Sequence, residues 1–211
     1  MRKLTFESGV RSEFAVDFQT ATISPSPQML ETRLDQEPVI RLWNAAVQGD
    51  RAALSDLLRQ HQDQIFRFCL SQLHDENLAV DATQETAKRL IQRLNSFDSN
   101  ARFSTWVLGF ALNVCREMRR KSNRNQSLDD CDASQHVDFD EDPGNRLAQQ
   151  EDRSRLTQAL RRLPVRQQRA IILRYFESLS IAEIAKVMGI EIGTVKATLH
   201  NALKKLKQLL D

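Results

Sequence analysis

The sequence has few of the residues that break helices or build disulfide and metal sites. Its 211 residues include only 6 Gly, 5 Pro and 3 Cys. Cys69, Cys115 and Cys131 lie far apart and form no CxxC pair, and the four histidines are scattered. Zinc sites and disulfide frameworks use closely spaced Cys or His residues, so we expect reduced thiols, no metal and no cofactor. The scarcity of Gly and Pro favours helices over sheets.

Long apolar runs are missing as well. No stretch approaches the roughly 20 apolar residues that a membrane-spanning helix needs. The N-terminus begins Met1-Arg2-Lys3 and lacks the apolar stretch of a signal peptide. We therefore expect a cytoplasmic protein with no membrane insertion. The apolar fraction of 41% is still large enough for buried cores, in one medium domain or two small ones.

A net charge of only +2 predicts no particular partner, but the charges are unevenly distributed. Residues 122–145 hold seven acidic residues and, after Arg124, no Lys or Arg. Residues 151–211 carry twelve Lys or Arg against six Asp or Glu. These shifts predict an all-α fold with two small helical domains and an acidic flexible linker. The expected units are a flexible N-terminal extension (1–37), a helical domain (38–121), the linker (122–145) and a basic helical domain (146–211).

In the first domain, apolar residues recur at three- and four-residue intervals, which predicts four helices from Pro38 onward. Asp50 is expected to cap the second helix. The third helix is expected at about 78–94, and the fourth at about 104–120 with Ser104 as its N-cap.

The end of the chain has the pattern of a helix-turn-helix. Ser180 can cap a short helix that ends at Gly189, because Gly tolerates the left-handed backbone of a tight turn. Gly193 and Thr194 open a second helix, whose early residues would enter the major groove of DNA. The alternative interpretation is an ordinary solvated helix face. The candidate DNA-binding residues are Thr194, Lys196, Ala197, His200, Asn201 and Lys204.

Two further polar groups stand out in the first domain. One occupies a single face of the expected third helix. This face can pair with charged residues of a partner helix, or it can be an ordinary solvated face. Its members are Asp81, Gln84, Glu85 and Lys88. The other is basic and lies at the end of the fourth helix, where it can neutralise phosphates. Its members are Arg116, Arg119, Arg120 and Lys121.

Two sets of motifs give a specific resemblance. The segment from Leu163 to Ala202 reads LPxRQ…LRYFExLSxxEIAxxMGIxxGTVKxxLHxA, which resembles the promoter-binding C-terminal domain of extracytoplasmic-function (ECF) sigma factors. In the first domain, Gly49-Asp50 resembles the GDxxAF entry of this family, and residues 81–85 resemble its D-x-x-Q-E segment. Residues 97–113 match its FD…RF..W…A.N signature. The resemblance covers roughly residues 38–210.

The resemblance implies core RNA polymerase and promoter DNA as partners, and makes an anti-sigma factor a further candidate. It assigns the face of Asp81, Gln84, Glu85 and Lys88 to the coiled coil of the largest polymerase subunit. It assigns the second helix of the helix-turn-helix to the minus-thirty-five element. The minus-ten element would be bound and melted by Asn100, Arg102, Asn113, Arg116, Arg119, Arg120 and Lys121. The chain departs from the family pattern at Val80, where an acid is usual, and at Thr198, Asn201 and Leu203, where arginines are common.

Two other classes of protein compete with this interpretation. A stand-alone helix-turn-helix regulator would explain the C-terminal motif and leave the motifs of residues 97–113 without a role. An enzyme such as a recombinase would need a catalytic constellation. The sequence offers no Gly-rich phosphate loop, no ligand-spaced His or Cys and no nucleophile with a nearby base. We therefore expect no enzymatic activity and assign no catalytic residue.

Overall fold

The computed structural model describes residues 36–126 and 155–210, with side chains described as far as residue 122 in the first range. The regular elements in these ranges are all helical, which confirms the predicted all-α fold. The expected N-terminal extension and most of the acidic linker lie outside the described residues. Within the described ranges, no helix is both long enough and apolar enough to cross a membrane.

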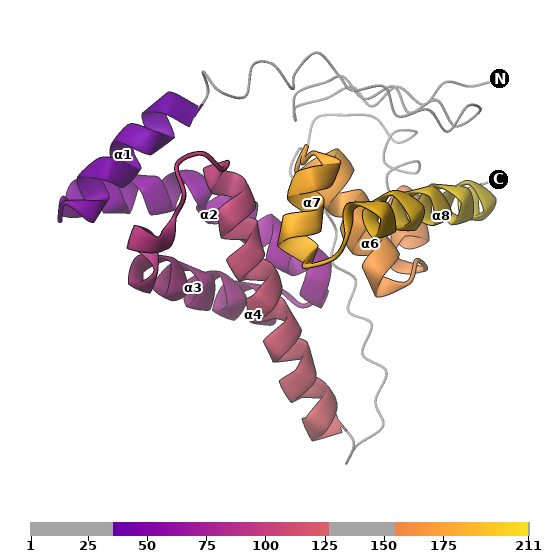
Figure 1. Ribbon diagram of the computed structural model, residues 1–211. Helices are drawn as coiled ribbons and strands as arrows, with labels where there is room; N and C mark the ends of the chain where they lie inside the picture. The colour runs from indigo at the N-terminus through magenta and orange to yellow at the C-terminus, as the bar shows by residue number, and fades with distance from the viewer. Residues whose placement is uncertain (1–35, 127–154, 211) are drawn as a thin grey trace, which may run out of the picture.

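Four α-helices form the N-terminal half around one apolar core (Figure 1). They are α1 (Glu37–Val47), α2 (Arg51–Leu73), α3 (Glu76–Gln92) and α4 (Phe103–Gln126), with the short 3-10 helix η3 (Leu94–Ser96) after α3. The largest fully buried side chains of this core include Leu57, Phe68, Leu90, Leu108 and Leu112. Each fully buried side chain of this size contributes roughly 1.5–3 kcal/mol relative to its exposed state.

Aspartates cap two of these helices. The Asp50 carboxylate accepts from the Ala52 and Ala53 backbone N–H groups at 2.8 and 3.1 Å, as the sequence predicted. Asp75 accepts from the Leu78 N–H at 2.8 Å, so α3 begins two residues earlier than expected.

The prediction that Ser104 caps α4 is wrong. The Arg102 carbonyl already accepts the Trp106 N–H at 3.2 Å, so Ser104 lies inside the first turn. Phe103, the first residue of α4, is buried, which places the helix start one residue before Ser104. At its other end α4 continues through Gln126, beyond the expected end at about residue 120. In Figure 1 its last turns project past the other helices.

The C-terminal half contains the predicted helix-turn-helix. Residues 155–161 are helical and are followed by α6 (Val165–Ile171) and the π-helical turn η4 (Ile172–Phe176). α7 (Ile181–Met188) and α8 (Ile192–Leu210) then complete this half. Gly189 has φ 67°, which confirms the left-handed turn between α7 and α8.

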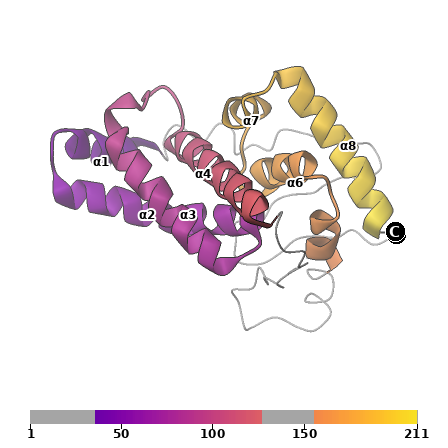
Figure 2. The same cartoon turned by 90° about the horizontal axis from the view of Figure 1, so that it is seen from below.

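The two halves pack against each other. Figures 1 and 2 show α7 beside α4, while α8 lies on the far side of the C-terminal half from α1, α2 and α3. Because α7 packs on both α4 and α8, it buries Val187 as well as Ala185 and Met188. A short helix that contacted the helix-turn-helix core alone would leave one of these faces in solvent.

Candidate polymerase-binding and DNA-binding surfaces

The four residues predicted to bind polymerase lie on one exposed face of α3. Asp81, Gln84 and Lys88 are exposed and Glu85 is half-buried. All four line a hollow of about 320 Å³ between α3 and α4, which we call the α3 hollow. The α4 side of this hollow is formed by Val114, Glu117, Met118 and Lys121. Acidic, basic and amide side chains therefore meet in one shallow depression, which suits a charged helical partner.

A three-residue ion cluster borders this hollow. The Arg89 Nε donates to Glu85 Oε1 at 2.8 Å within α3. The Arg89 Nη1 and Nη2 donate to both carboxylate oxygens of Glu117 on α4, at 2.8 and 2.7 Å. Hydrogen bonds and charge from Glu117 and Glu85 raise the pKa of Arg89, and Arg89 lowers the pKa of Glu117. This fork-to-fork geometry is the strongest form of an Arg–carboxylate pair.

A second and larger hollow lies on the other side of this cluster. It measures about 670 Å³, and we call it the α3–α4 groove. Its lining residues are Arg89, Gln92, Arg93, Ser96, Phe110, Asn113, Arg116, Glu117 and Arg120. The groove thus holds four arginines and one carboxylate, and that carboxylate is already paired with Arg89. An excess of Arg, with amides beside an aromatic ring, suits a nucleic-acid strand.

The structure brings together only some of the residues predicted for the minus-ten element. Asn113, Arg116 and Arg120 share the α3–α4 groove. Lys121, in contrast, lines the α3 hollow. Arg119 is turned toward the other side of α4, where its Nη1 donates to the Gln72 carbonyl at 3.3 Å.

The two predicted residues that precede α4 are held by local or distant contacts. The Asn100 backbone N–H and side-chain amide both donate to Asp98 Oδ1 at 3.0 Å, which fixes an exposed turn. Arg102 points to the C-terminal half, where it donates to the Ser178 carbonyl at 3.4 Å and lies 3.8 Å from Glu183.

Sequence reasoning missed Gln92, Arg93 and Phe110 as groove residues. Gln92 and Arg93 follow Arg89 by three and four positions, so they share its side of the chain at the end of α3. This spacing can be read from the sequence. The sequence does not show which face of α4 lies beside these residues. Their placement depends on how α3 and α4 cross.

The aromatic residues around η3 are mainly structural. The rings of Phe97 and Phe103 lie 5.0 Å apart, and both side chains are buried. Trp106 packs against Phe103 at 5.4 Å and against Phe110 at 5.0 Å. Edge-to-face contacts of this kind stabilise a cluster beyond simple burial. Phe97 and Phe103 therefore hold the loop in place, and Phe110 alone among these residues reaches the groove.

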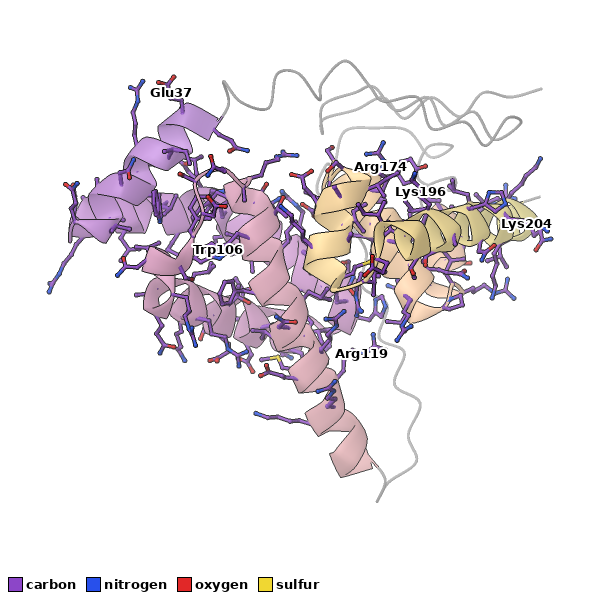
Figure 3. The ribbon with its side chains drawn as sticks, in the orientation of Figure 1. Glu37, Trp106, Arg119, Arg174, Lys196 and Lys204 are labelled. Atoms are coloured by element: carbon purple, nitrogen blue, oxygen red, sulfur yellow. The ribbon has the colours of Figure 1, made fainter. Side chains whose placement is uncertain are left out.

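The helix-turn-helix presents its predicted DNA-binding residues to solvent. Ser180 accepts from the Glu183 N–H at 3.2 Å, and Glu183 accepts from the Ser180 N–H at 2.8 Å, which completes a capping box. In α8 the buried stripe is Val195, Leu199, Ala202 and Leu206. The exposed face carries all the predicted residues, namely Thr194, Lys196, Ala197, His200, Asn201 and Lys204. Figure 3 shows Lys196 and Lys204 along α8, away from α4.

Contacts between the halves engage part of the predicted minus-ten surface. Thr105 on α4 donates to Glu183 at 3.0 Å, and the Arg116 Nη2 donates to the Met188 carbonyl at 3.0 Å. A second set of contacts joins α2 to the C-terminal half, with the Arg169 Nε donating to Gln72 Oε1 at 2.9 Å. Arg169 is only 6% exposed. Burial, together with Arg116 and Arg119, lowers its pKa to about 10, so like charges oppose this packing.

The two described cysteines, Cys69 and Cys115, are buried free thiols in hydrogen-bonding contact with each other. The pKa of the Cys69 thiol is raised by its hydrogen bond with Cys115 and by burial. Because the thiolate is the reactive form, the raised pKa disfavours the reactive form of Cys69. Within residues 36–126 and 155–210, no group of three His, Cys, Asp or Glu side chains could hold a metal ion.

Comparison with known proteins decides the family. Residues 57–125 match the model of sigma-70 region 2, and residues 153–206 match that of sigma-70 region 4. The ECF RNA polymerase sigma factor SigW of Bacillus subtilis is 31% identical over 172 residues, covering 77% of this chain and 92% of SigW. The chain belongs to the ECF sigma factors. The predicted resemblance is thereby confirmed, and this sigma factor binds core RNA polymerase and directs transcription initiation from promoter DNA.

Other relatives agree with this assignment. The ECF sigma factor BldN of Streptomyces coelicolor is 27% identical and covers 83% of this sigma factor and 67% of BldN. Two solved structures share the fold at 23% identity. The complex of RpoE with the anti-sigma factor NepR from Bartonella quintana has a TM-score of 0.64 and covers 74% of this chain and 95% of that one. The complex of CnrH with the cytosolic domain of CnrY has a TM-score of 0.61, covering 83% and 98%.

Proposed function

We propose that this sigma factor divides promoter recognition among three surfaces. The α3 hollow, with Asp81, Gln84, Glu85 and Lys88, binds the coiled coil of the largest polymerase subunit. The α3–α4 groove holds the melted minus-ten strand, and the exposed face of α8 reads the minus-thirty-five duplex. The observation that carries this division is the separation of a mixed-charge hollow and an Arg-rich groove by the Arg89–Glu117 pair.

Each surface has chemistry suited to its partner. Asn113 and Gln92 offer amides to base edges, Phe110 offers a ring face, and arginines offer cations to phosphates. On α8, Thr194, Lys196 and Asn201 occupy early exposed positions of a helix that fits the major groove. Arg102 and Arg119, which lie outside the groove, would contact the flanking backbone.

The proposal includes the domain limits and the setting of the protein. The N-terminal domain begins at about residue 38 and ends with α4 at Gln126, and the C-terminal domain spans residues 146–211. The acidic segment between them is the linker, and residues 1–37 form an extension. As a DNA-binding initiation factor, this sigma factor would work in the cytoplasm and leave catalysis to the polymerase. An anti-sigma factor is a further proposed partner, because RpoE was solved with one.

Run-off transcription with purified core polymerase tests the division of labour. Initiation at defined sites only in the presence of the full chain is the expected result. Replacement of both Asp81 and Glu85 by Ala should abolish binding to core polymerase and leave binding to minus-thirty-five duplex intact. The Lys196→Ala, Lys204→Ala double variant should weaken binding to the minus-thirty-five duplex and leave binding to core polymerase intact. A chain that binds duplex DNA but never binds core polymerase would instead be a stand-alone helix-turn-helix regulator.

A further inference from the structure

The Arg89–Glu117 pair lies at the boundary between the two proposed binding surfaces, and neither surface gives the pair a role. Arg89 and Glu117 are the two residues that line both the α3 hollow and the α3–α4 groove. Glu117 is also the only acid in the basic stretch from Arg116 to Arg124. An unpaired carboxylate there would repel DNA phosphate and weaken the groove. The bidentate bond to Arg89 neutralises this carboxylate, so the pair leaves the other arginines of the groove without an opposing free acid from Glu117.

The geometry shows what Glu117 does to Arg89. Two donors of the guanidinium are bound by one carboxylate on a neighbouring helix, which fixes the plane of the fork. The remaining Nε–H then points at Glu85 Oε1, 2.8 Å away. Glu85 is one helical turn before Arg89 and is 36% exposed at its side chain, so a free glutamate would sample several rotamers. The cluster removes that freedom while the second carboxylate oxygen, Oε2, makes no hydrogen bond within the described residues.

We propose that Arg89 is a positioning residue for polymerase binding, which holds the Glu85 carboxylate ready for its partner and is itself locked by Glu117. This inference rests on the proposed function, because it takes the face of Glu85 as the polymerase contact. A pre-ordered carboxylate loses less conformational entropy on binding than a mobile one. The affinity gain therefore passes through Glu85, although Arg89 also lines the α3 hollow.

A double-mutant cycle tests whether Arg89 affects polymerase affinity through Glu85. Affinity of the full chain for core polymerase, without DNA, is measured for wild type, Glu85→Gln, Arg89→Gln and the double variant. We expect each single variant to bind about threefold to tenfold more weakly. The double variant should bind no more weakly than Glu85→Gln alone, because Arg89 acts only through Glu85. Equal losses from Arg89→Gln in both backgrounds would show an independent contact and overturn the proposal.

A charge reversal separates positioning from simple bridging of the two helices. The Arg89→Glu, Glu117→Arg double variant can restore an ion pair between α3 and α4, but it places a glutamate beside Glu85. We expect its thermal unfolding temperature to return to that of wild type while its polymerase affinity stays low. Recovery of both quantities would make Arg89 a structural bridge and would refute the positioning role.

A control variant and Glu85→Gln together separate failure of the positioning role from failure of the proposed polymerase surface. Arg41 on α1 forms a similar i,i+4 pair with Glu37 at 3.1 Å but lies on neither surface. Arg41→Gln should therefore leave polymerase affinity unchanged. If Glu85→Gln also leaves it unchanged, the proposed polymerase surface is wrong, and the positioning role fails with it. If Glu85→Gln weakens binding and Arg89→Gln does not, only the positioning role is refuted.

Discussion

The two helices with predicted DNA contacts, α4 and α8, expose those contacts to very different degrees. On α8, the buried residues form one stripe and every predicted DNA-binding residue is exposed. On α4, the basic residues are divided among the α3–α4 groove, the α3 hollow and the contact with the C-terminal half. A recognition surface is therefore already open on α8, whereas the surface of α4 is shared with intramolecular contacts.

The shared surface has a physical consequence. Arg102 and Arg116 both bind groups in the C-terminal half, at Ser178 and Met188. These bonds use one donor of each guanidinium group, so we expect both side chains to contact DNA more fully when α7 leaves α4. Burial and the nearby Arg120 and Arg166 lower the pKa of Arg116, so like charges already oppose the packed arrangement. The polar bonds of Thr105 and Arg169 stabilise it.

The largest expected effect is on the open surface of α8. Replacing Lys196 and Lys204 together by Ala should weaken binding to minus-thirty-five duplex roughly 10- to 100-fold and reduce the salt slope by about two. Both side chains are exposed and make no hydrogen bond or ion pair with the residues that the structure describes, so their loss should leave the fold unchanged. Fluorescence anisotropy at several salt concentrations measures both quantities. Arg41→Gln serves as the control, and an unchanged salt slope in the double variant would remove α8 from the phosphate contacts.

The next largest effect is the loss of stability when a helix N-cap is removed from either half. Ser180→Ala should cost about 1 kcal/mol, because the Glu183 N–H loses its acceptor. Asp50→Ala at α2 should cost a similar amount. Only Ser180→Ala should also weaken minus-thirty-five binding, since α7 positions α8. Thermal unfolding and duplex affinity test this. Equal DNA affinities for both variants would show that α8 holds its position without a well-formed α7.

The helix caps at Asp50 and Ser180, the turn between α7 and α8 and the exposed face of α8 were predicted from the sequence, because each depends on local chemistry. Asp50, Ser180 and Gly189 act on backbone groups within four positions, so their roles follow from local chemistry. The exposed face of α8 follows from helical periodicity. The start of α4 was predicted incorrectly, because burial of Phe103 outweighed the capping preference of Ser104. The family resemblance came from residue patterns, and the comparisons confirmed it.

Contacts between the halves were beyond the reach of sequence patterns. Thr105 and Glu183 are 78 positions apart, and Gln72 and Arg169 are 97 apart. Their meeting depends on how the two halves pack against each other, which periodicity and capping do not encode. The lining of the α3–α4 groove was also beyond prediction from sequence patterns. Arg93 and Asn113 line it together only because α3 and α4 cross there. Residue types identified candidate sites, and packing decided which candidates lie together.

A smaller effect should follow from loosening the contact between α4 and α7. Thr105→Val keeps the shape of a buried side chain but removes its hydrogen bond to Glu183, while the capping box remains. Loss of about 1 kcal/mol should favour separated halves, and minus-ten fork DNA should then bind about two- to fivefold more tightly.

Small-angle scattering and fork-DNA affinity together test the Thr105→Val prediction. The radius of gyration of the variant should increase along with its affinity. Thr86→Val is the matched control, because Thr86 is also buried but donates to Ala82 within its own helix at 2.7 Å. An unchanged radius and an unchanged affinity in Thr105→Val would mean that the packing of α7 on α4 does not compete with DNA.

The smallest expected effect is a pH dependence of the same packing. Burial, and then Arg161 and Arg119, lower the pKa of His74 from 6.5, and Gln168 of the C-terminal half lies 3.4 Å from its ring. Packing therefore favours the neutral form of the His74 ring. Its contribution to stability is complete above pH 6.5 and is lost as the pH falls through the lowered pKa, because the unfolded chain then binds the extra proton.

His74→Asn isolates this contribution, since Asn tolerates the left-handed backbone that His74 adopts at φ 56°. We expect urea unfolding of wild type to lose more stability between pH 7.5 and 5.5 than the variant loses, by less than about 1 kcal/mol. Burial raises the pKa of Glu177, so that group titrates with the opposite sign in both proteins and cancels in the comparison. His61, whose pKa burial also lowers, lies inside the N-terminal half and is common to both. Identical pH profiles would place the proton-sensitive contact elsewhere than between the two halves.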